Sequence, residues 1–537
     1  MQSMLTPKLN ENDALRKLIS NIVSYAKFDH PLNQVDIAET NISYILLTGK
    51  YAYKFKKGVD LGFLNFTELE ERKFYCEEEV RLNRRLAPDM YLDVIRITGN
   101  RNQPEINGAG PVIEYAVKMR QFKKNTELDY LLRNGLFKTD YVDQLAEDIA
   151  AFHTVIKLAS PGTQYGSYDV ISRTTFENIR DLASCITHDK TYAKKLDDIN
   201  GWSKQHLAIL KPIMLKRKEQ GYIRECHGDL HLGNIALHQD KPIIFDCIEF
   251  SEDLRWIDTI CDIAFLIMDF ESYQHPVLAY RFLNNYLEHC GDYEGLTLLR
   301  FYCAYRALVR AKVYALGLSK EIPDEKKHIL KQQYQHYIEL ALNYTRPNVP
   351  FILITHGLSG SGKTTITRII LEELGAIRIR SDIERKRLNK LDTSDSSHSG
   401  LKSGLYTQTK SDQVYQHLAD ISKIIIQSDY PVIVDATFLD KQYRALFKSL
   451  ASGLKVPFII LNFLGSKQNL MARIQEREKQ AKDASEADIK VLEHQLNNMM
   501  PLETSEQNLE ISIDTNTDID YPNLINKIKT KLSKYNI

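Results

Sequence analysis

Phe351-Ile-Leu-Ile-Thr-His-Gly357-Leu-Ser-Gly-Ser-Gly-Lys-Thr364 is the stretch that decides the fold of the second half of the chain. Its apolar start is typical of a buried strand, and the glycines that follow leave backbone N–H groups free to surround phosphates. Beyond it, apolar residues recur at helical spacing, at Ile366, Ile369, Ile370 and Leu374. The order of strand, glycine-rich turn and helix predicts a P-loop nucleotide site rather than a turn with a chance lysine.

Several positions of this loop are expected to hold a nucleotide and its metal ion. The Lys363 ammonium is expected to reach the β- and γ-phosphates, and the Thr364 hydroxyl is expected to hold Mg²⁺. The other positions predicted to bind the nucleotide are Gly357, Ser359, Gly360, Ser361, Gly362 and Thr365. The predicted cofactors are therefore ATP and Mg²⁺.

Charged residues follow later elements of the same half. Asp382 comes directly after the run 376–380, at the strand end where α/β proteins bind ligands, and suits a base for an acceptor hydroxyl. Asp435 ends the buried run 431–435, where a Mg²⁺ ligand is expected. Arg473 and Arg477 share one helix face and are predicted to close over the phosphates as a catalytic lid. Taken singly, each of these residues is also compatible with a helix cap or a solvated side chain.

The length of the chain predicts more than one domain. At 537 residues it exceeds what one hydrophobic core usually supports. Because a P-loop strand normally opens its domain, we expect a P-loop domain at 351–537 and a separate domain at 1–345. Residues 346–350 contain two prolines, which end the preceding helix, and are predicted to be a linker.

Composition narrows the functional class. Lysine plus arginine and aspartate plus glutamate balance at 70 each, which disfavours a general electrostatic grip on nucleic acid or anionic lipid. The 7 cysteines have no metal-type spacing and are expected to be reduced. No apolar run approaches the roughly 18 residues that a membrane span needs. We therefore expect a cytoplasmic protein without membrane partners.

The first domain is predicted to have two lobes, an N-lobe at about 35–122 and a C-lobe at about 123–345. The N-lobe should contain four strands and one charged helix, the strands at 41–48, 50–56, 91–98 and 112–122 and the helix at 67–86. From residue 128 onward the pattern is largely helical. The fold class expected for the whole chain is thus an α+β bilobal fold followed by an α/β P-loop fold with a parallel sheet.

A second candidate site lies in the C-lobe, in Cys226-His-Gly-Asp229-Leu-His-Leu-Gly-Asn234 and the later Asp246. An Asp that orients the acceptor hydroxyl, an Asn five residues later and an Asp after the next strand form the constellation of protein-kinase-like phosphotransfer. Asp229 is thus predicted to be catalytic, and Asn234 and Asp246 to bind metal. His227 and His231 are spaced like zinc ligands, but no third ligand is apparent, so zinc is disfavoured.

The His-Gly-Asp form of this motif resembles the aminoglycoside phosphotransferase and choline kinase branch of the protein-kinase-like superfamily, over roughly 35–345. The resemblance implies that Lys54 pairs with the nucleotide phosphates and that Glu79, or alternatively Glu78, is its helix partner. It also implies an adenine-binding hinge at 119–122 and further acidic residues near the site at Glu249 and Asp262. One glycine, Gly49, stands where protein kinases have a glycine-rich loop.

The second half resembles small-molecule and polynucleotide P-loop kinases, including gluconate kinase, polynucleotide kinase and zeta-toxin-like enzymes, over about 351–515. Asp382 with Arg385 and the strand end Asp435-Ala-Thr437 carry that resemblance. The order of the two halves resembles a bacterial fusion family that joins an aminoglycoside phosphotransferase-like domain to a P-loop ATP-binding domain.

Three functions follow from these patterns. The favoured one is a kinase with two nucleotide sites that transfers the γ-phosphate of ATP to hydroxyl groups of small molecules. The alternatives are an ATP-responsive regulatory protein in which one domain only binds nucleotide, and a nucleic-acid 5′-hydroxyl kinase. Acceptor identity and oligomeric state have no readable signal, and the patch 394–399 predicts a mobile loop.

Overall fold

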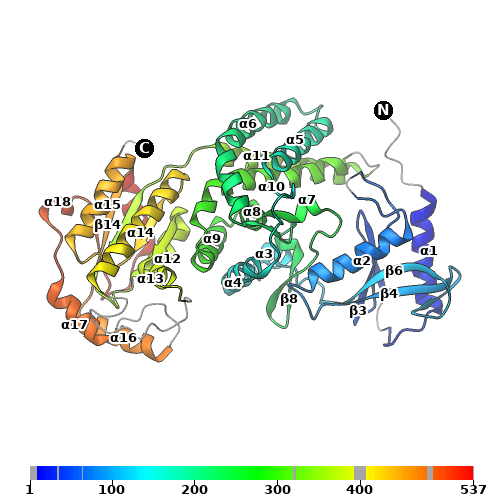
Figure 1. Ribbon diagram of the computed structural model, residues 1–537, viewed down its shortest axis with the longest axis horizontal. Coiled ribbons are helices and arrows are strands. Elements are labelled where there is room, and N and C mark those ends of the chain that lie inside the picture. The colour runs from blue at the N-terminus through cyan, green and yellow to red at the C-terminus, as the bar shows by residue number, and fades with distance from the viewer. Residues whose placement is uncertain are drawn as a thin grey trace. The chain divides into compact units, whose positions relative to one another are not determined.

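The computed structural model describes residues 9–32, 35–62, 64–318, 322–391, 407–480 and 488–535 (Figure 1). The chain forms two compact units, and each contains a sheet of its own. The first unit comprises residues 1–141, 152–178 and 207–269, and the second comprises 142–151, 179–206 and 270–537. The patch at 394–399 lies outside the described residues.

The first unit contains an antiparallel sheet, which in the described residues has six strands in the order β1-β2-β3-β6-β4-β5. These strands are β1 (Asp36–Glu39), β2 (Ser43–Leu47), β3 (Tyr51–Lys56), β4 (Tyr91–Asn100), β5 (Gln103–Ile106) and β6 (Val112–Arg120). Alternation along β3 sends Tyr53 and Phe55 into the core under α1 (Leu9–Tyr25). The next residues, Lys54 and Lys56, therefore face the opposite side, toward α2 (Leu69–Asn83).

A short hairpin carries the predicted C-lobe motif. After η1 (Leu232–Asn234), the strands β8 (Ile235–His238) and β9 (Lys241–Ile244) pair with Ile235 opposite Ile244. The two turn residues, Gln239 and Asp240, both have positive φ, which is the geometry of a tight hairpin turn. The hairpin therefore returns the chain to its starting point and brings Asp246 close to Asn234.

The other elements before residue 273 are short strands and helices. They are α3 (Leu128–Arg133), α4 (Asp140–Val155), α5 (Tyr168–Cys185), α6 (Lys190–Glu219), β7 (Ile223–Glu225), α7 (Glu252–Arg255), β10 (Trp256–Asp258) and α8 (Thr259–Ser272). β7 pairs with β10 in a two-stranded sheet. Helices α4, α5, α6 and α8 contribute residues to both units.

The second unit contains a parallel sheet of five strands, as far as the structure describes the chain, in the order β12-β13-β11-β14-β15. The strands are β11 (Ile352–His356), β12 (Ile377–Arg380), β13 (Val432–Asp435), β14 (Phe458–Leu464) and β15 (Glu510–Asp514). Parallel strands covered on their faces are typical of α/β folds. The fold class predicted for both halves is confirmed.

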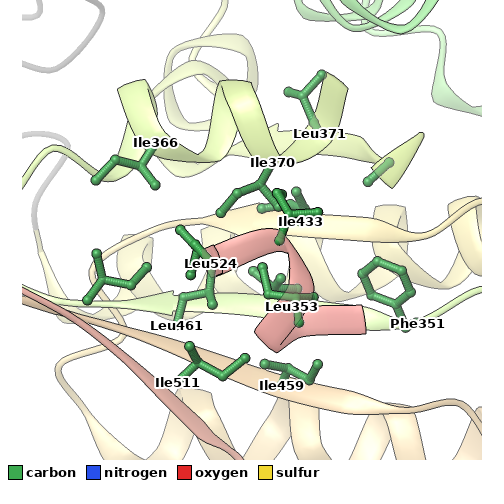
Figure 2. Close-up of a cluster of buried hydrophobic side chains, with 14 of the residues drawn as sticks. Phe351, Leu353, Ile366, Ile370, Leu371, Ile433, Ile459, Leu461, Ile511 and Leu524 are labelled. Carbon is green, nitrogen blue, oxygen red and sulfur yellow. The ribbon is translucent and has the colours of Figure 1, made fainter. Parts of the chain in front are cut away.

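Helices cover this sheet. Figure 2 shows α12 (Lys363–Leu374) packing Ile366, Ile370 and Leu371 onto strand residues such as Leu353 and Leu461, with Leu524 of α19 (Tyr521–Ser533) in the same cluster. Ile369, expected on the buried face, is partly exposed, and Leu371 takes its place. Helices α14 (Gln408–Gln427) and α15 (Lys441–Leu454) contact β13 and β11.

The remaining elements of the second unit are α9 (Pro276–Cys290), η2 (Tyr293–Gly295), α10 (Leu296–Gly317), α11 (Asp324–Thr345), α13 (Ser381–Leu388), α16 (Lys467–Gln480), α17 (Ile489–Asn498) and α18 (Thr504–Gln507). Helix α11 ends at Thr345, directly before the two prolines of the predicted linker. Among the described helices, none combines the length and the apolar character required to cross a bilayer.

Candidate active sites

Lys54 lies at the centre of a buried ion-pair network in the first unit. Its Nζ lies 2.8 Å from Glu79 Oε1 of α2 and 2.6 Å from Asp246 Oδ1. Burial alone would lower the pKa of this ammonium, but the Asp246 and Glu79 carboxylates outweigh it and hold the pKa well above its ordinary value. The β3 lysine, the helix glutamate and the aspartate after β9 are therefore brought together, as their predicted roles require.

The choice left open between two glutamates is decided by geometry. Glu79 is fully buried and faces Lys54, whereas Glu78 forms an ion pair with Arg81, Nε to Oε1 2.7 Å. Glu79 Oε2 also accepts a hydrogen bond from Lys56 Nζ at 2.7 Å, and Lys56 contacts Glu249 as well. Glu79 is therefore held by two lysines from one face of β3.

Asp229 and Asn234 form one hydrogen-bonded turn. Asn234 Nδ2 donates to the Asp229 carbonyl and to Asp229 Oδ2, both at 3.0 Å. His231 Nε2 lies 3.4 Å from the same carboxylate oxygen, and the Asp229 side chain is 37 % exposed. The carboxylate is thus oriented from within its own loop while it is open to an incoming molecule.

The backbone of this turn is fixed from α8. Asp262 accepts hydrogen bonds from the N–H groups of His227 and Gly228, at 3.1 and 2.8 Å, and contacts His153 Nε2 at 3.1 Å. Gly228 has φ 88°, and a Cβ there would lie 2.7 Å from the Leu254 carbonyl oxygen. Only glycine fits this position without displacement.

Metal-type donors also gather beside this loop. In the part of the chain that the structure describes, His153, Cys226 and Asp262 are close enough together to be considered. Both Asp262 oxygens, however, already accept the backbone and histidine bonds just described. The arrangement is explained by support of the loop, and the histidine pair considered from sequence, His227 and His231, is not part of this group.

Asp246 has an unusual backbone conformation. Its φ of 65° lies in the left-handed region, which is costly for a residue other than glycine. Its N–H donates to the Tyr91 hydroxyl at 3.2 Å, and the next N–H, of Cys247, donates to Asn83 Oδ1 at 2.8 Å. These two bonds hold the strained turn, and the Asp246 side chain is 43 % exposed.

The sequence has one glycine, Gly49, where protein kinases have a glycine-rich loop over the phosphates. Gly49, with φ 89°, lies in the turn between β2 and β3, and its N–H donates to Gln121 Oε1 at 2.9 Å. That N–H is therefore already bonded within the protein. The connection between β1 and β2 is only residues 40–42 and contains no glycine. The hinge positions 119–122 run from the end of β6 into the following loop.

In the second unit, the P-loop backbone wraps around Lys363. The Lys363 ammonium donates to the carbonyl oxygens of Gly357 and Leu358, at 3.0 and 2.8 Å. Burial lowers its pKa to about 8, against the opposing effect of the Asp435 and Asp382 carboxylates. Gly360, with φ 80°, is required because a Cβ would lie 2.8 Å from the Leu470 carbonyl oxygen.

The hydroxyl and the carboxylate predicted to hold the metal ion are in contact. Thr364 Oγ1 donates to Asp435 Oδ2 at 2.8 Å. The contact arises because β13, which ends at Asp435, runs parallel to β11, so both strands end at the same edge of the sheet, where α12 begins at Lys363. The sequence predictions for Thr364 and Asp435 thus converge on one place.

The other residues predicted to belong to the P-loop site differ in how directly the structure connects them to Lys363. Asp382, in the first turn of α13, is close enough to act electrostatically on Lys363, as is Arg477. Arg473 Nη1 donates to Thr515 Oγ1 at 3.2 Å and lies 3.9 Å from the Cβ position of Gly362. Thr365 is exposed, and its role stays a prediction.

Four residues around these sites were missed from sequence. Lys56 follows Lys54 by two residues in a strand, and Asn83 follows Glu79 by four residues in a helix. Each spacing puts the second residue on the same face as the first, so strand and helix periodicity could have identified both. Tyr91 and Gln495 had no such signal, because each arrives from a separate element. Gln495 Oε1 of α17 accepts a hydrogen bond from the Ser359 N–H of the P-loop at 2.8 Å.

Comparison with known proteins assigns the chain to a protein family. Rv2004c of Mycobacterium tuberculosis, titled an uncharacterized protein, is 30 % identical over 427 residues, which cover 79 % of this chain and 83 % of the relative. Mb2027c of Mycobacterium bovis matches equally. The chain belongs to the family of these mycobacterial proteins. Neither name states an activity, so the chemistry of this Rv2004c-family chain has to be inferred from its sites and its domain matches.

Two domain families match within this Rv2004c-family chain. The Phosphotransferase enzyme family matches residues 138–299, and the AAA domain matches residues 352–502. Both parts of the predicted fusion, a phosphotransferase domain followed by a P-loop domain, are confirmed in one chain. With the kinase-type site built around Lys54, these matches identify the chain as a kinase. The exact domain boundaries predicted at 345 and 351 stay predictions.

Solved structures match at low similarity. Choline kinase from Cryptosporidium parvum is 11 % identical with a TM-score of 0.39, covering 61 % of this chain and 95 % of that chain. A gluconokinase from Sinorhizobium meliloti is 18 % identical with a TM-score of 0.26, covering 35 % and 94 %.

Proposed function

We propose that this kinase has two ATP sites and transfers the γ-phosphate of ATP to hydroxyl groups of small molecules. The observation that carries the proposal is that each predicted phosphate-binding lysine lies beside its predicted metal-binding carboxylate. Lys54 contacts Asp246 directly, and Lys363 is followed in sequence by Thr364, which contacts Asp435. Two such arrangements in one chain support two phosphotransfer sites.

At the first site, we assign the acceptor hydroxyl to the Asp229 carboxylate. The hydroxyl oxygen attacks the γ-phosphorus, its proton passes to Asp229, and the bond between the γ-phosphorus and the bridging oxygen breaks to release ADP. Asn234 holds the carboxylate in position through its two bonds to Asp229. Lys54, kept charged by Glu79 and Asp246, neutralises the phosphates.

The donor atoms fit a magnesium ion. Asn234 and Asp246 in the first unit, and Thr364 and Asp435 in the second, offer amide, hydroxyl and carboxylate oxygens, which hard cations prefer. Asp246 is exposed enough for an ion to approach, and the Thr364 and Asp435 oxygens already lie 2.8 Å apart. When bound, Mg²⁺ would neutralise charge on the phosphate oxygens.

At the second site, Lys363 would bind the β- and γ-phosphates through its ammonium, and Asp382 would accept the acceptor proton. The charges of Asp382 and Arg477 both act on Lys363, which supports their assignment to one pocket. Arg473 would join Arg477 in closing over the phosphates after leaving Thr515. Gly357, Ser359, Gly360, Ser361, Gly362 and Thr365 supply the surrounding loop.

We propose small cytoplasmic alcohols as acceptors for both sites. The equal numbers of acidic and basic residues, 70 each, argue against nucleic acid as the general partner, although a 5′-hydroxyl end is an acceptor of the same chemistry. The competing proposal is a regulatory protein that senses ATP through one binding-only domain. The oriented and partly exposed Asp229 carboxylate favours the enzyme, because a sensor has no use for a base.

The deciding experiment follows label from γ-labelled ATP onto a panel of hydroxyl compounds, including 5′-hydroxyl oligonucleotides. Asp229→Ala and Lys363→Ala are compared with the unaltered full-length chain. We expect each variant to abolish a different transfer activity. If both variants retain every transfer and turnover rate while ATP still binds, the regulatory proposal replaces the enzymatic one.

A further inference from the structure

The β12 edge of the P-loop sheet is covered by a helix from outside the P-loop domain sequence. Strand β12 is at one end of the sheet order, so within the described part of the chain one side of its backbone is not paired with a strand. Asn284 of α9 bonds there like a neighbouring strand: its Nδ2 donates to the Ala376 carbonyl at 2.9 Å, and its Oδ1 accepts from the Arg378 N–H at 2.7 Å. The Asn284 amide thus occupies two backbone groups at an edge of the sheet that would otherwise be open to pairing.

One helical turn further along α9, Glu288 reaches the same strand. Glu288 Oε1 accepts from Arg378 Nη2 at 2.8 Å, and Glu288 Oε2 lies 3.6 Å from Arg380 Nη1. The Arg378 side chain is 5 % exposed and that of Glu288 is 12 % exposed. The pair is therefore largely withdrawn from water, where loss of one partner is costly for the other.

The other end of the Arg378 guanidinium reaches the P-loop helix. Arg378 Nη1 donates to the Thr364 carbonyl at 2.8 Å and lies 3.4 Å from Thr367 Oγ1. Thr364 is the residue whose hydroxyl contacts Asp435 at 2.8 Å. A continuous chain of polar contacts thus runs from Glu288 through Arg378 to the residue assigned to the metal ion.

We propose that α9 is a working part of the P-loop site and that Glu288 is a positioning residue, which acts through Arg378 to fix Thr364. Helix α9 lies within residues 138–299, the range matched by the Phosphotransferase enzyme family, whereas the AAA domain begins at 352. The P-loop site therefore depends on residues from the other domain family. This inference rests on the proposed function of the P-loop site.

The mechanism is electrostatic orientation. Glu288 is the acidic partner that keeps one edge of the Arg378 guanidinium in place, so the opposite edge points at the first turn of α12. Without that carboxylate, the guanidinium loses its charge partner and is no longer held against the Thr364 carbonyl. Residues that orient a metal ligand typically affect metal affinity or activity by about 10- to 100-fold.

The test uses the full-length chain carrying Asp229→Asn, which silences the first site, and measures the transfer activity that Lys363→Ala removes. In this background, Glu288→Gln should raise the Mg²⁺ concentration for half-maximal rate by about tenfold. The KM for the acceptor should be unchanged, because Glu288 is not assigned to it. Glu288→Asp, which retains the charge, should restore part of the loss.

Asn285→Ala is the matched control on the same helix. The Asn285 side chain donates to Asp143 Oδ1 at 2.5 Å instead of reaching β12, so its removal should leave the Mg²⁺ requirement unchanged. An Arg378→Gln variant supplies the second measurement. If Glu288 acts through Arg378, the double variant should be no worse than Arg378→Gln alone.

The outcomes separate the two proposals. If Lys363→Ala removes an activity but Glu288→Gln shifts only the unfolding midpoint and not the Mg²⁺ requirement, α9 is structural and this inference is overturned. Additive losses in the double variant overturn it as well, because the two residues would then act independently. If Lys363→Ala removes no activity, it is the proposed function of the P-loop site that fails.

Discussion

Two lysines assigned to the same task, binding the phosphates of ATP, have opposite surroundings in the two units. Lys54 forms ion pairs with Glu79 and Asp246, and its pKa lies well above the ordinary value. Lys363 donates to backbone carbonyls, and burial lowers its pKa to about 8. The positive charge of Lys54 is thus balanced by carboxylates in the protein, whereas the Lys363 ammonium is bonded mainly to the dipoles of backbone carbonyls.

The difference shows that a lysine assigned to phosphate binding can contribute mainly to the stability of the fold or mainly to the binding of its ligand. Removal of Lys54 leaves Asp246 without the ammonium that contacts it and leaves Glu79 with Lys56 alone, so the folded state depends on Lys54. The Lys363 charge is poorly compensated until an anion arrives, so nucleotide binding, more than folding, depends on it. The predictions below test this contrast, from the largest expected effect to the smallest.

Lys54→Met should destabilise the first unit by about 3 kcal/mol, at the lower end for a broken buried pair because Asp246 is partly exposed. The measurement is urea unfolding, with hydrogen exchange of 43–56 to locate the effect. Lys118→Met is the control, since its partner Asp29 is 64 % exposed and such pairs contribute up to about 1 kcal/mol. Equal losses in the two variants would remove the contrast.

Lys363→Met should have the opposite sign and stabilise the second unit at pH 7 by about 1 kcal/mol, while abolishing nucleotide binding at the P-loop. A pKa lowered from 10.5 to about 8 means that the folded state disfavours the charge. Part of that gain is offset by the two carbonyl bonds that are lost. Slower hydrogen exchange across 352–374 would support the prediction, and faster exchange would refute it.

Nucleotide affinity at the P-loop should weaken by about fivefold between pH 8 and pH 9, which follows from a single group with a pKa near 8. The sign is set by charge: above this pKa the free protein has a neutral Lys363, which must take up a proton to bind phosphate. Calorimetric titration with ATP in an Asp246→Asn background isolates this site. Lys363→Arg should flatten the profile, because guanidinium keeps its proton.

Tyr91→Phe should cost about 1 kcal/mol, the value of one hydrogen bond, by removing the acceptor for the Asp246 N–H. The first-site transfer rate should fall by less than tenfold, with the P-loop activity unchanged. Paired rate measurements on both activities provide the check. A loss confined to the P-loop activity would show that Tyr91 does not serve the Asp246 turn.

The sequence predicted most of the fold because local periodicity and motif spacing both pointed the same way. The glycine-rich stretch at 357–364, the strands around Lys54 and the turn from Asp229 to Asn234 all form as expected. Glu79 could not be separated from Glu78 by spacing, because a helix that contains three consecutive acidic residues offers more than one candidate. The choice depended on which face α2 turns toward β3.

Long-range contacts were beyond the reach of the sequence. The bond from Gln495 to the P-loop and that from Tyr91 to Asp246 join elements far apart in the chain, with no motif to announce them. The role of α9 was also hidden, because its residues read as part of the first domain. Its two contacts with β12, through Asn284 and Glu288, depend on tertiary packing alone.

The left-handed backbone at Asp246 has a consequence for how this position can change. Among residues other than glycine, asparagine and aspartate adopt that conformation most readily, whereas a β-branched residue would be strongly strained in it. Asparagine would thus preserve the path of the chain while erasing the negative charge. A single replacement of one carboxylate oxygen by an amide nitrogen would therefore separate the two roles of this position, because the turn would remain while Lys54 lost the negative charge that contacts it.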